Sequence, residues 1–151
     1  MNRTAFLRLV FVAVVTSWIT AGCSTFNHEW EKAASAPNQG VQGRWIGTWK
    51  SDVTGHTEDL RCILKQTGEG KYSARFYAHY KYGIRFAVGY RVHLEGQESN
   101  GTLKFHGDEN LHWYAGGVYH YDGTVDSTNF SSTYACKYDH GSFQMTRPSA
   151  P

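Results

Sequence analysis

From Gly43 onward, apolar and polar residues alternate with a period of two, which is the pattern of β-strands that bury one face. In residues 84–95 the apolar positions alternate with Arg85, Gly89, Arg91, His93 and Glu95. Residues 71–80 alternate in the same way. The pattern predicts further strands at residues 43–51, 58–66, 101–107, 112–125, 128–138 and 142–147.

Short turn sequences separate these runs: "TGEG", "KYG", "GQESNG", "GDENL", "DST" and "DHG". Gly116-Gly117, inside the run 112–125, suggests a bulge or a sharp bend. No segment after Gly43 has the apolar stripe of a helix. About eight antiparallel strands joined by short loops are typical of an all-β, up-and-down barrel, which leaves no free edge; a flattened β-sandwich is the alternative.

The first 22 residues follow a different pattern. Arg3 and Arg8 precede or flank the apolar run "LVFVAVVTSWI", which has about a dozen residues where a membrane-spanning helix needs roughly 20. Thr20-Ala21-Gly22 then leads directly to Cys23. Length and flanking charge therefore predict a cleaved signal peptide at residues 1–22.

This segment resembles the signal of bacterial lipoproteins, in which the cysteine is acylated and becomes the new N-terminus. Thr20 stands where such signals usually have Leu. The resemblance implies lipidation at Cys23 and attachment of the chain to the membrane of the bacterial cell envelope. Ser24 resembles the sorting pattern for the outer membrane, so we expect the protein there, facing the periplasm. An ordinary cleaved signal peptide is the alternative.

The remaining chain divides into two parts. Residues 23–42 are polar and contain the breaker "PNQG", so we expect a lipidated tether with at most one weak helical turn. Residues 43–151 are enough for one β-barrel domain. When Arg3 and Arg8 are removed, the basic residues fall from 15 to the number of acidic ones, 13. A chain without net positive charge argues against a nucleic-acid partner.

Gly43-Arg44-Trp45 in the first strand and Arg147 at the end of the last resemble the lipocalin-like, or calycin, barrels. The resemblance implies that Trp45 closes one end of the barrel by packing against Arg147. Avidin-like barrels share the first-strand tryptophan and remain an alternative. We expect a monomer, and the resemblance supplies an architecture rather than a particular ligand.

Cys62 and Cys136 remain after Cys23 is acylated. In an exported protein two remaining thiols usually form a disulfide, and we expect that bond here. In a closed meander, however, strands two and seven are separated by strands eight and one. The bond therefore requires both side chains to point inward across a flattened barrel.

The sequence offers no recognisable catalytic or metal site. His79, His93, His106 and His120 lack the close spacing of zinc ligands, and the best local cluster, His106 and His112 with Asp108 and Glu109, is typical of a solvated loop. No Gly-X-Ser-X-Gly motif or phosphate-binding loop is found. We predict no enzymatic activity, no metal and no cofactor.

Aromatic residues are abundant instead: 10 Tyr, 8 Phe and 5 Trp. Inward tyrosines could line a site for a small apolar or amphipathic ligand, because each combines an apolar ring with a hydroxyl. The predicted ligand-binding residues are Trp49, Tyr72, Phe76, Tyr80, Phe86, Tyr90, Trp113 and Tyr134. The alternative is a filled barrel that acts as a structural or protein-interaction module of the envelope. Its contacts would then be made by loops or by Tyr77, His79, Tyr114 and His120.

Overall fold

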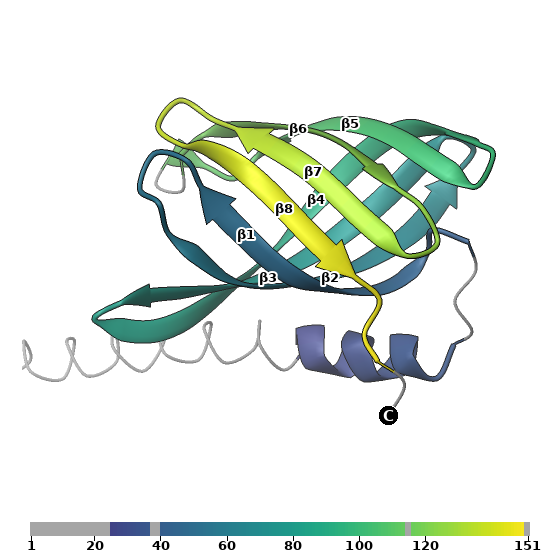
Figure 1. Cartoon of the computed structure of the whole chain (residues 1–151), viewed down its shortest axis with the longest axis horizontal. Helices are drawn as coiled ribbons and strands as arrows, with labels where there is room; N and C mark the ends of the chain where they lie inside the picture. Colours follow the sequence, from purple (N-terminus) through teal and green to yellow (C-terminus); the bar gives the residue numbers. More distant parts are fainter. Residues whose placement is uncertain (1–24, 37–39, 114–115, 150–151) are drawn as a thin grey trace, which may run out of the picture.

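The computed structural model describes residues 25–36, 40–113 and 116–149, without the side chain of Tyr82. Cys23, the segment 1–22 and Tyr114 lie outside these ranges. The strands are β1 (Gly43–Ser51), β2 (Thr57–Gly68), β3 (Lys71–Tyr82), β4 (Ile84–Ser99), β5 (Thr102–Asn110), β6 (Val118–Val125), β7 (Asn129–Ala135) and β8 (His140–Thr146). Each pairs antiparallel with the next, and β1 also pairs with β8. The predicted up-and-down barrel is confirmed and the sandwich is excluded (Figure 1).

The period of two decides which side chains fill the barrel. In β3, Tyr72, Ala74, Phe76 and Ala78 point inward and are buried. Cys62 lies between them and β1, opposite Phe76 on one side and Trp45 on the other. Large side chains from all eight strands therefore form one packed core inside the barrel.

The seam between β1 and β8 depends on glycine. A Cβ at Gly47 would lie 2.0 Å from the carbonyl oxygen of Gln144, and one at Gly141 would lie 1.9 Å from that of Lys50. Such contacts with backbone cannot be relieved by moving a side chain. Glycine at both positions thus lets the first and last strands approach and close the barrel.

Trp45 and Arg147, the pair singled out by the calycin resemblance, are in direct contact at one end. The Arg147 guanidinium carbon lies 3.7 Å from the centre of the Trp45 ring. The guanidinium also donates to the carbonyl oxygens of Gly40, Gln42, Arg44 and Ser127, at 2.6 to 3.3 Å. Trp45 is fully buried and donates its indole N–H to the carbonyl of Val41. This end of the barrel is closed.

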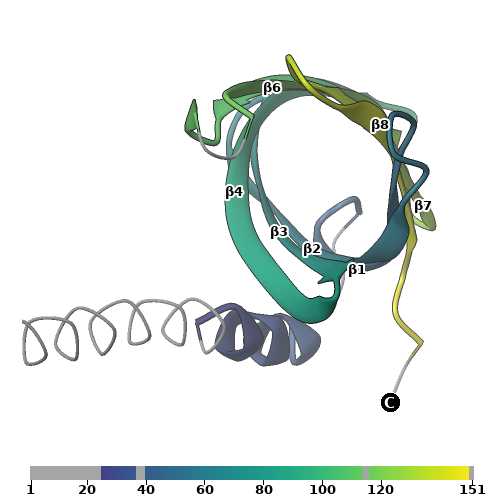
Figure 2. The same cartoon turned by 90° about the vertical axis from the view of Figure 1, so that its left-hand side faces the viewer.

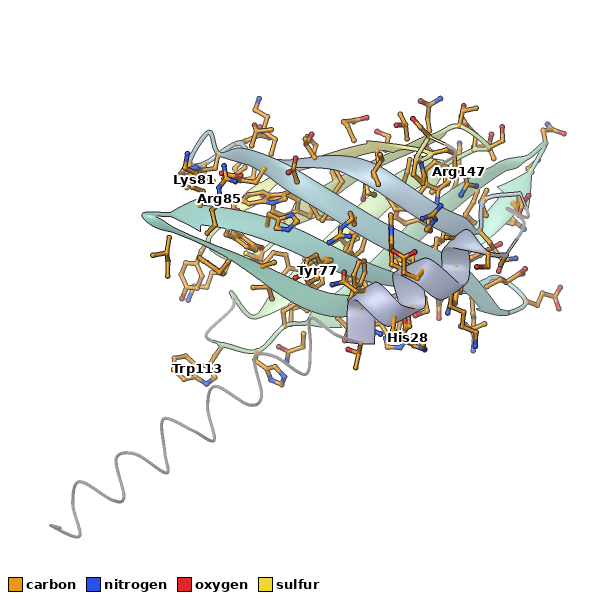
Figure 3. All side chains as sticks on the ribbon, turned by 90° about the horizontal axis from the view of Figure 1, so that it is seen from below. His28, Tyr77, Lys81, Arg85, Trp113 and Arg147 are labelled. Carbon is orange, nitrogen blue, oxygen red and sulfur yellow. The ribbon has the colours of Figure 1, made fainter. Side chains whose placement is uncertain are left out.

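A helix at residues 25–34 packs on the outside of the barrel, where the sequence predicted at most one weak turn (Figures 1 and 2). Phe26 and Trp30 are buried against Ile63 and Tyr77. The Phe26 and Tyr77 rings stack with centroids 4.8 Å apart, and Figure 3 shows Tyr77 beside the helix. The sequence misses this helix because only one short apolar stripe marks it, and its stability comes from the barrel wall.

The hairpin of β3 and β4 is longer than its neighbours and projects beyond the opposite end of the barrel (Figure 1). β4 pairs with β3 along twelve residues, but with β5 only from Glu95 to Ser99. Residues 112–113 and 116–117, predicted as strand, instead lie outside the strands before β6, and both Gly116 and Gly117 have positive φ. These features leave this end open, and we refer to it as the open end.

Candidate functional site: an aromatic cavity at the open end

The half of the barrel at the open end contains a cavity of about 740 Å³. Its wall comes from the end of β1, the β3–β4 hairpin, the β5–β6 loop and the β7–β8 loop. Cavities of this size hold small organic molecules in other proteins. The interior is therefore filled at the closed end and hollow at the open end. The sequence alone could not decide between a filled barrel and one with a cavity.

The predicted ligand-binding residues fall into three groups. Trp49, Tyr80, Phe86, Tyr90 and Tyr134 line the cavity. Tyr72 and Phe76 face inward as predicted, but they lie in the packed core and do not line the cavity. Trp113 belongs to the exposed loop after β5, so its assignment to the inner face was wrong. The alternation fails there because Trp113 lies outside any strand.

Sequence reasoning missed several cavity residues, of which Tyr119 and Tyr121 matter most. Both lie on β6 and share its inward face. The misread strand 112–125 obscured this face, although the alternation of Tyr119, Tyr121 and Gly123 with polar residues could have revealed it.

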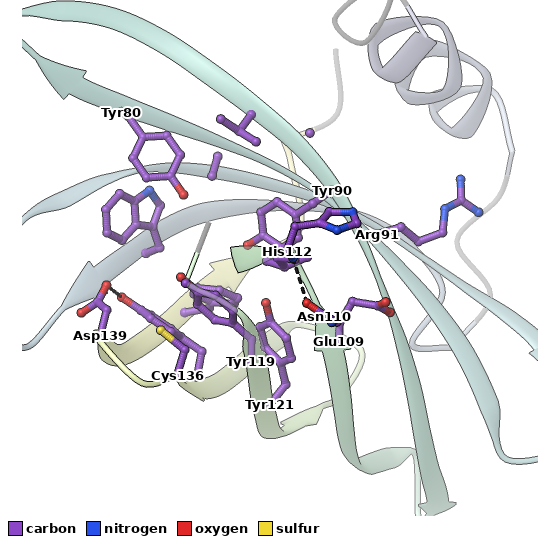
Figure 4. Close-up of a pocket in the computed structure, with 18 of the residues that line it drawn as sticks. Tyr80, Tyr90, Arg91, Glu109, Asn110, His112, Tyr119, Tyr121, Cys136 and Asp139 are labelled. Atoms are coloured by element: carbon purple, nitrogen blue, oxygen red, sulfur yellow. Dashed lines mark hydrogen bonds between the residues drawn. The ribbon is translucent and has the colours of Figure 1, made fainter. Parts of the chain in front are cut away.

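Four tyrosines converge on the cavity (Figure 4): Tyr80, Tyr90, Tyr119 and Tyr121. Within the described part of the chain, the hydroxyls of Tyr80, Tyr90 and Tyr121 have no hydrogen-bond partner. Burial raises the pKa of Tyr90 well above its ordinary value, and the nearby hydroxyls of Tyr121 and Tyr80 raise it further. Burial likewise raises the pKa of Tyr121. These phenols are neutral at physiological pH and are available as hydrogen-bond donors.

Asp139 holds the β7–β8 loop over one side of the cavity. Its carboxylate accepts hydrogen bonds from the Tyr134 hydroxyl at 3.0 Å and from the Ser51 hydroxyl at 2.6 Å. Burial raises the pKa of Tyr134, and the bond to Asp139 raises it further. The backbone N–H of Asp52 donates to the carbonyl of His140, which fixes the same loop to the end of β1.

Glu109 closes the wall where β4 and β5 separate. Its carboxylate accepts hydrogen bonds from the backbone N–H of His93 at 3.2 Å and pairs with the His93 ring nitrogen at 2.8 Å. A side chain thus replaces the backbone pairing that ends at Glu95. Arg91 and Asn110 also line this side of the cavity.

The expected disulfide is absent: Cys62 and Cys136 are both free thiols. Cys62 is buried in the packed core, whereas Cys136 follows β7 and lines the cavity at the open end. The two strands are separated by β1 and β8, and the cysteines lie at different depths. The round, aromatic-filled barrel does not provide the flattening that the bond required. Burial raises the pKa of Cys62 well above its ordinary value, so its thiol is protonated.

Two separate histidine–carboxylate pairs lie on β4 to β6. His120 pairs with Asp108 at 2.6 Å, and His93 pairs with Glu109. Among residues 25–36, 40–113 and 116–149, no three His, Cys, Asp or Glu side chains are grouped in a way that could hold a metal ion. In the same ranges no helix is both long enough and apolar enough to cross a bilayer.

No protein-family model matches this chain, and neither the curated proteins nor the solved structures include a significant match. The site must therefore be interpreted from its own geometry.

Proposed function

We propose that this protein is a lipid-anchored protein of the bacterial envelope, and that its barrel binds a small, mostly apolar ligand with a hydrogen-bond acceptor at one end. The observation that carries the proposal is a set of tyrosine hydroxyls without a partner among the described residues, in a cavity whose walls are largely aromatic. Apolar walls favour burial of a hydrocarbon or ring system. Neutral phenols favour an acceptor group such as a carbonyl, an ether or a carboxylate.

The bound ligand would satisfy groups that the protein leaves unsatisfied. A ligand acceptor at Tyr90 or Tyr121 would form a hydrogen bond with a hydroxyl that has no protein partner among the described residues, which is worth about 0.5–1.5 kcal/mol. A ligand that lacks the acceptor would displace water from these hydroxyls and leave them without a partner. The cavity is therefore expected to discriminate fatty acids or similar amphiphiles from plain hydrocarbons of the same size.

The proposed anchor follows from the sequence Thr20-Ala21-Gly22-Cys23. Acylation at Cys23 would keep the binding barrel at a membrane surface of the envelope, on the periplasmic side of the outer membrane. We propose that the protein acts there as a monomeric binding protein rather than an enzyme.

A ligand titration tests the binding function. The chain from Thr25 onward contains every residue of the core and the cavity and can be titrated with a fluorescent fatty acid such as cis-parinaric acid. We expect saturable binding, weakened about 2- to 12-fold by Tyr90→Phe or Tyr121→Phe, since each removes one hydrogen bond. Tyr72→Phe, which deletes a hydroxyl outside the cavity, is the matched control and should bind like the wild type. Equal effects of all three changes, or no binding at all, would reject the proposal.

A further inference from the structure

Most of the large exposed apolar side chains in the described part of the chain lie at the open end of the barrel. Among the described residues, the four loops or turns at that end present Val53, Ile84, Trp113 and Tyr138, which are 55%, 73%, 86% and 66% exposed. The turns at the closed end contain only polar residues and glycine, at 69–70, 100–101 and 126–128. Exposed apolar residues concentrated on one end of a molecule indicate an interaction surface rather than random exposure.

Basic residues surround these apolar side chains. Lys50, Lys81, Arg85 and Lys137 lie on the strand ends and loops of the open end and are exposed. Figure 3 shows Lys81 and Arg85 at the tip of the projecting hairpin, with Trp113 on the loop beside it. The acidic residues of these loops are Asp52, which pairs with Lys50, and Asp139, which accepts hydrogen bonds from Ser51 and Tyr134. On the strand ends, Asp108 and Glu109 pair with His120 and His93, and Glu58 lies near the start of β2.

The helix at residues 25–34 has its N-terminal end toward the open end of the barrel. Phe26, in the first turn of the helix, lies beside Tyr77 and Ala87. The helix then runs toward the closed end, where Lys32 and Ala33 approach Gln42 and Lys65. Its first residue is therefore the one nearer the open end, and it rests on the two strands of the projecting hairpin (Figure 1). Cys23 precedes that residue by two positions in the sequence.

We propose that the open end docks on an anionic lipid bilayer, with Ile84 and Trp113 entering the interfacial region and Lys81 and Arg85 contacting the headgroups. Tryptophan favours the membrane interface, and lysine and arginine are attracted to anionic lipids. The docked barrel presents the mouth of its cavity to the bilayer, so an amphipathic ligand passes between lipid and barrel without crossing water. The orientation rests on the proposed anchor at Cys23, whereas the docking surface rests on the open-end residues alone.

Quenching of tryptophan fluorescence by brominated lipids tests the docking directly. The acylated chain is reconstituted in vesicles of phosphatidylethanolamine and phosphatidylglycerol, with and without bromine on the acyl chains. Trp30, Trp45 and Trp49 are buried in the protein, so lipid-dependent quenching in the described part of the chain is assigned to Trp113. We expect Trp113→Phe to reduce the quenched fraction about twofold or more. Acylation at Cys23 removes the segment that contains Trp18, so the reconstituted, acylated chain lacks Trp18.

Charge reversal provides the second variant and its control. Lys81→Glu with Arg85→Glu should reduce the quenching of Trp113 about twofold or more, because two headgroup contacts become repulsive. Lys71→Glu with Lys104→Glu reverses the same amount of charge on exposed residues nearer the closed end and should leave the quenching unchanged. Quenching that is the same in the wild type and in Trp113→Phe, or that falls equally in both charge variants, would overturn the proposal.

Membrane docking, acylation and ligand binding are measured by different experiments. Acylation is read from the mass of the N-terminal peptide, and ligand binding is read by the titration above. An acylated, ligand-binding protein whose Trp113 is not quenched would reject the docking surface alone.

Discussion

At the scale of single residues, the two ends of the barrel use aromatic side chains in opposite ways. At the closed end, Trp45 has a complete set of partners: its ring stacks on Arg147 and its N–H is bonded to Val41. At the open end, the hydroxyls of Tyr90 and Tyr121 have no hydrogen-bond partner among the described residues. The first arrangement stabilises the fold, and the second leaves binding capacity for a ligand.

Trp45→Ala tests the stabilising role. Replacing a fully buried tryptophan by alanine leaves a cavity and removes the platform for Arg147, so we expect a loss of about 3–5 kcal/mol in the free energy of unfolding. Urea denaturation of both proteins measures the difference. A loss below about 1 kcal/mol would contradict the assignment of Trp45 to the core of the closed end.

The tyrosines also predict how stability depends on alkaline pH. Burial raises the pKa values of Tyr90, Tyr121 and Tyr134 in the folded barrel above the ordinary value of about 10. Folding therefore retains protons that the unfolded chain loses, so the stabilising contribution is full below about pH 10 and is lost as pH rises further. Urea midpoints measured from neutral to strongly alkaline pH should be flat and then fall. Tyr121→Phe should make the fall shallower, and an unchanged slope would contradict the assignment.

At the scale of elements, the helix at residues 25–34 and the β3–β4 hairpin account for most of what the sequence did not reveal. The alternation in β3 and β4 was interpreted correctly, but it cannot show that β4 outruns β5, so the exposure of Phe86 and Ile84 was missed. Phe26 and Trp30 gave too short a stripe to predict a helix. Their partner Tyr77 was interpreted as an outward residue available to another protein, and the helix covers it.

Phe26→Ala tests whether the helix depends on its contacts with the barrel. A ten-residue helix is marginal in water, and Phe26 supplies the stacked contact with Tyr77. We expect the amides of residues 25–34 to lose protection from hydrogen exchange while those of β2 and β3 keep theirs. Phe26→Leu preserves apolar volume and serves as the control. Unchanged protection in Phe26→Ala would show that the helix is held by other contacts, such as the Arg75–Glu29 ion pair.

At the scale of the whole molecule, the sequence predicted the barrel and its closed end, because period-two alternation and turn residues are local signals. It could not predict which half of the interior is filled, since that depends on how side chains from all strands share one volume. The disulfide prediction was wrong for the same reason. Cys62 and Cys136 lie at different depths in the barrel, and their spacing in the sequence does not show this.

The measurement that tests the central claim most directly is native mass spectrometry of the chain from Thr25 onward, purified from a periplasm without detergent. The account predicts a discrete mass above that of the polypeptide, released by organic solvent as a small amphiphile and reduced in Tyr90→Phe with Tyr121→Phe. Tyr72→Phe should retain it. A bare polypeptide mass, together with no uptake of cis-parinaric acid by the folded protein, would contradict the claim that the cavity is a binding site.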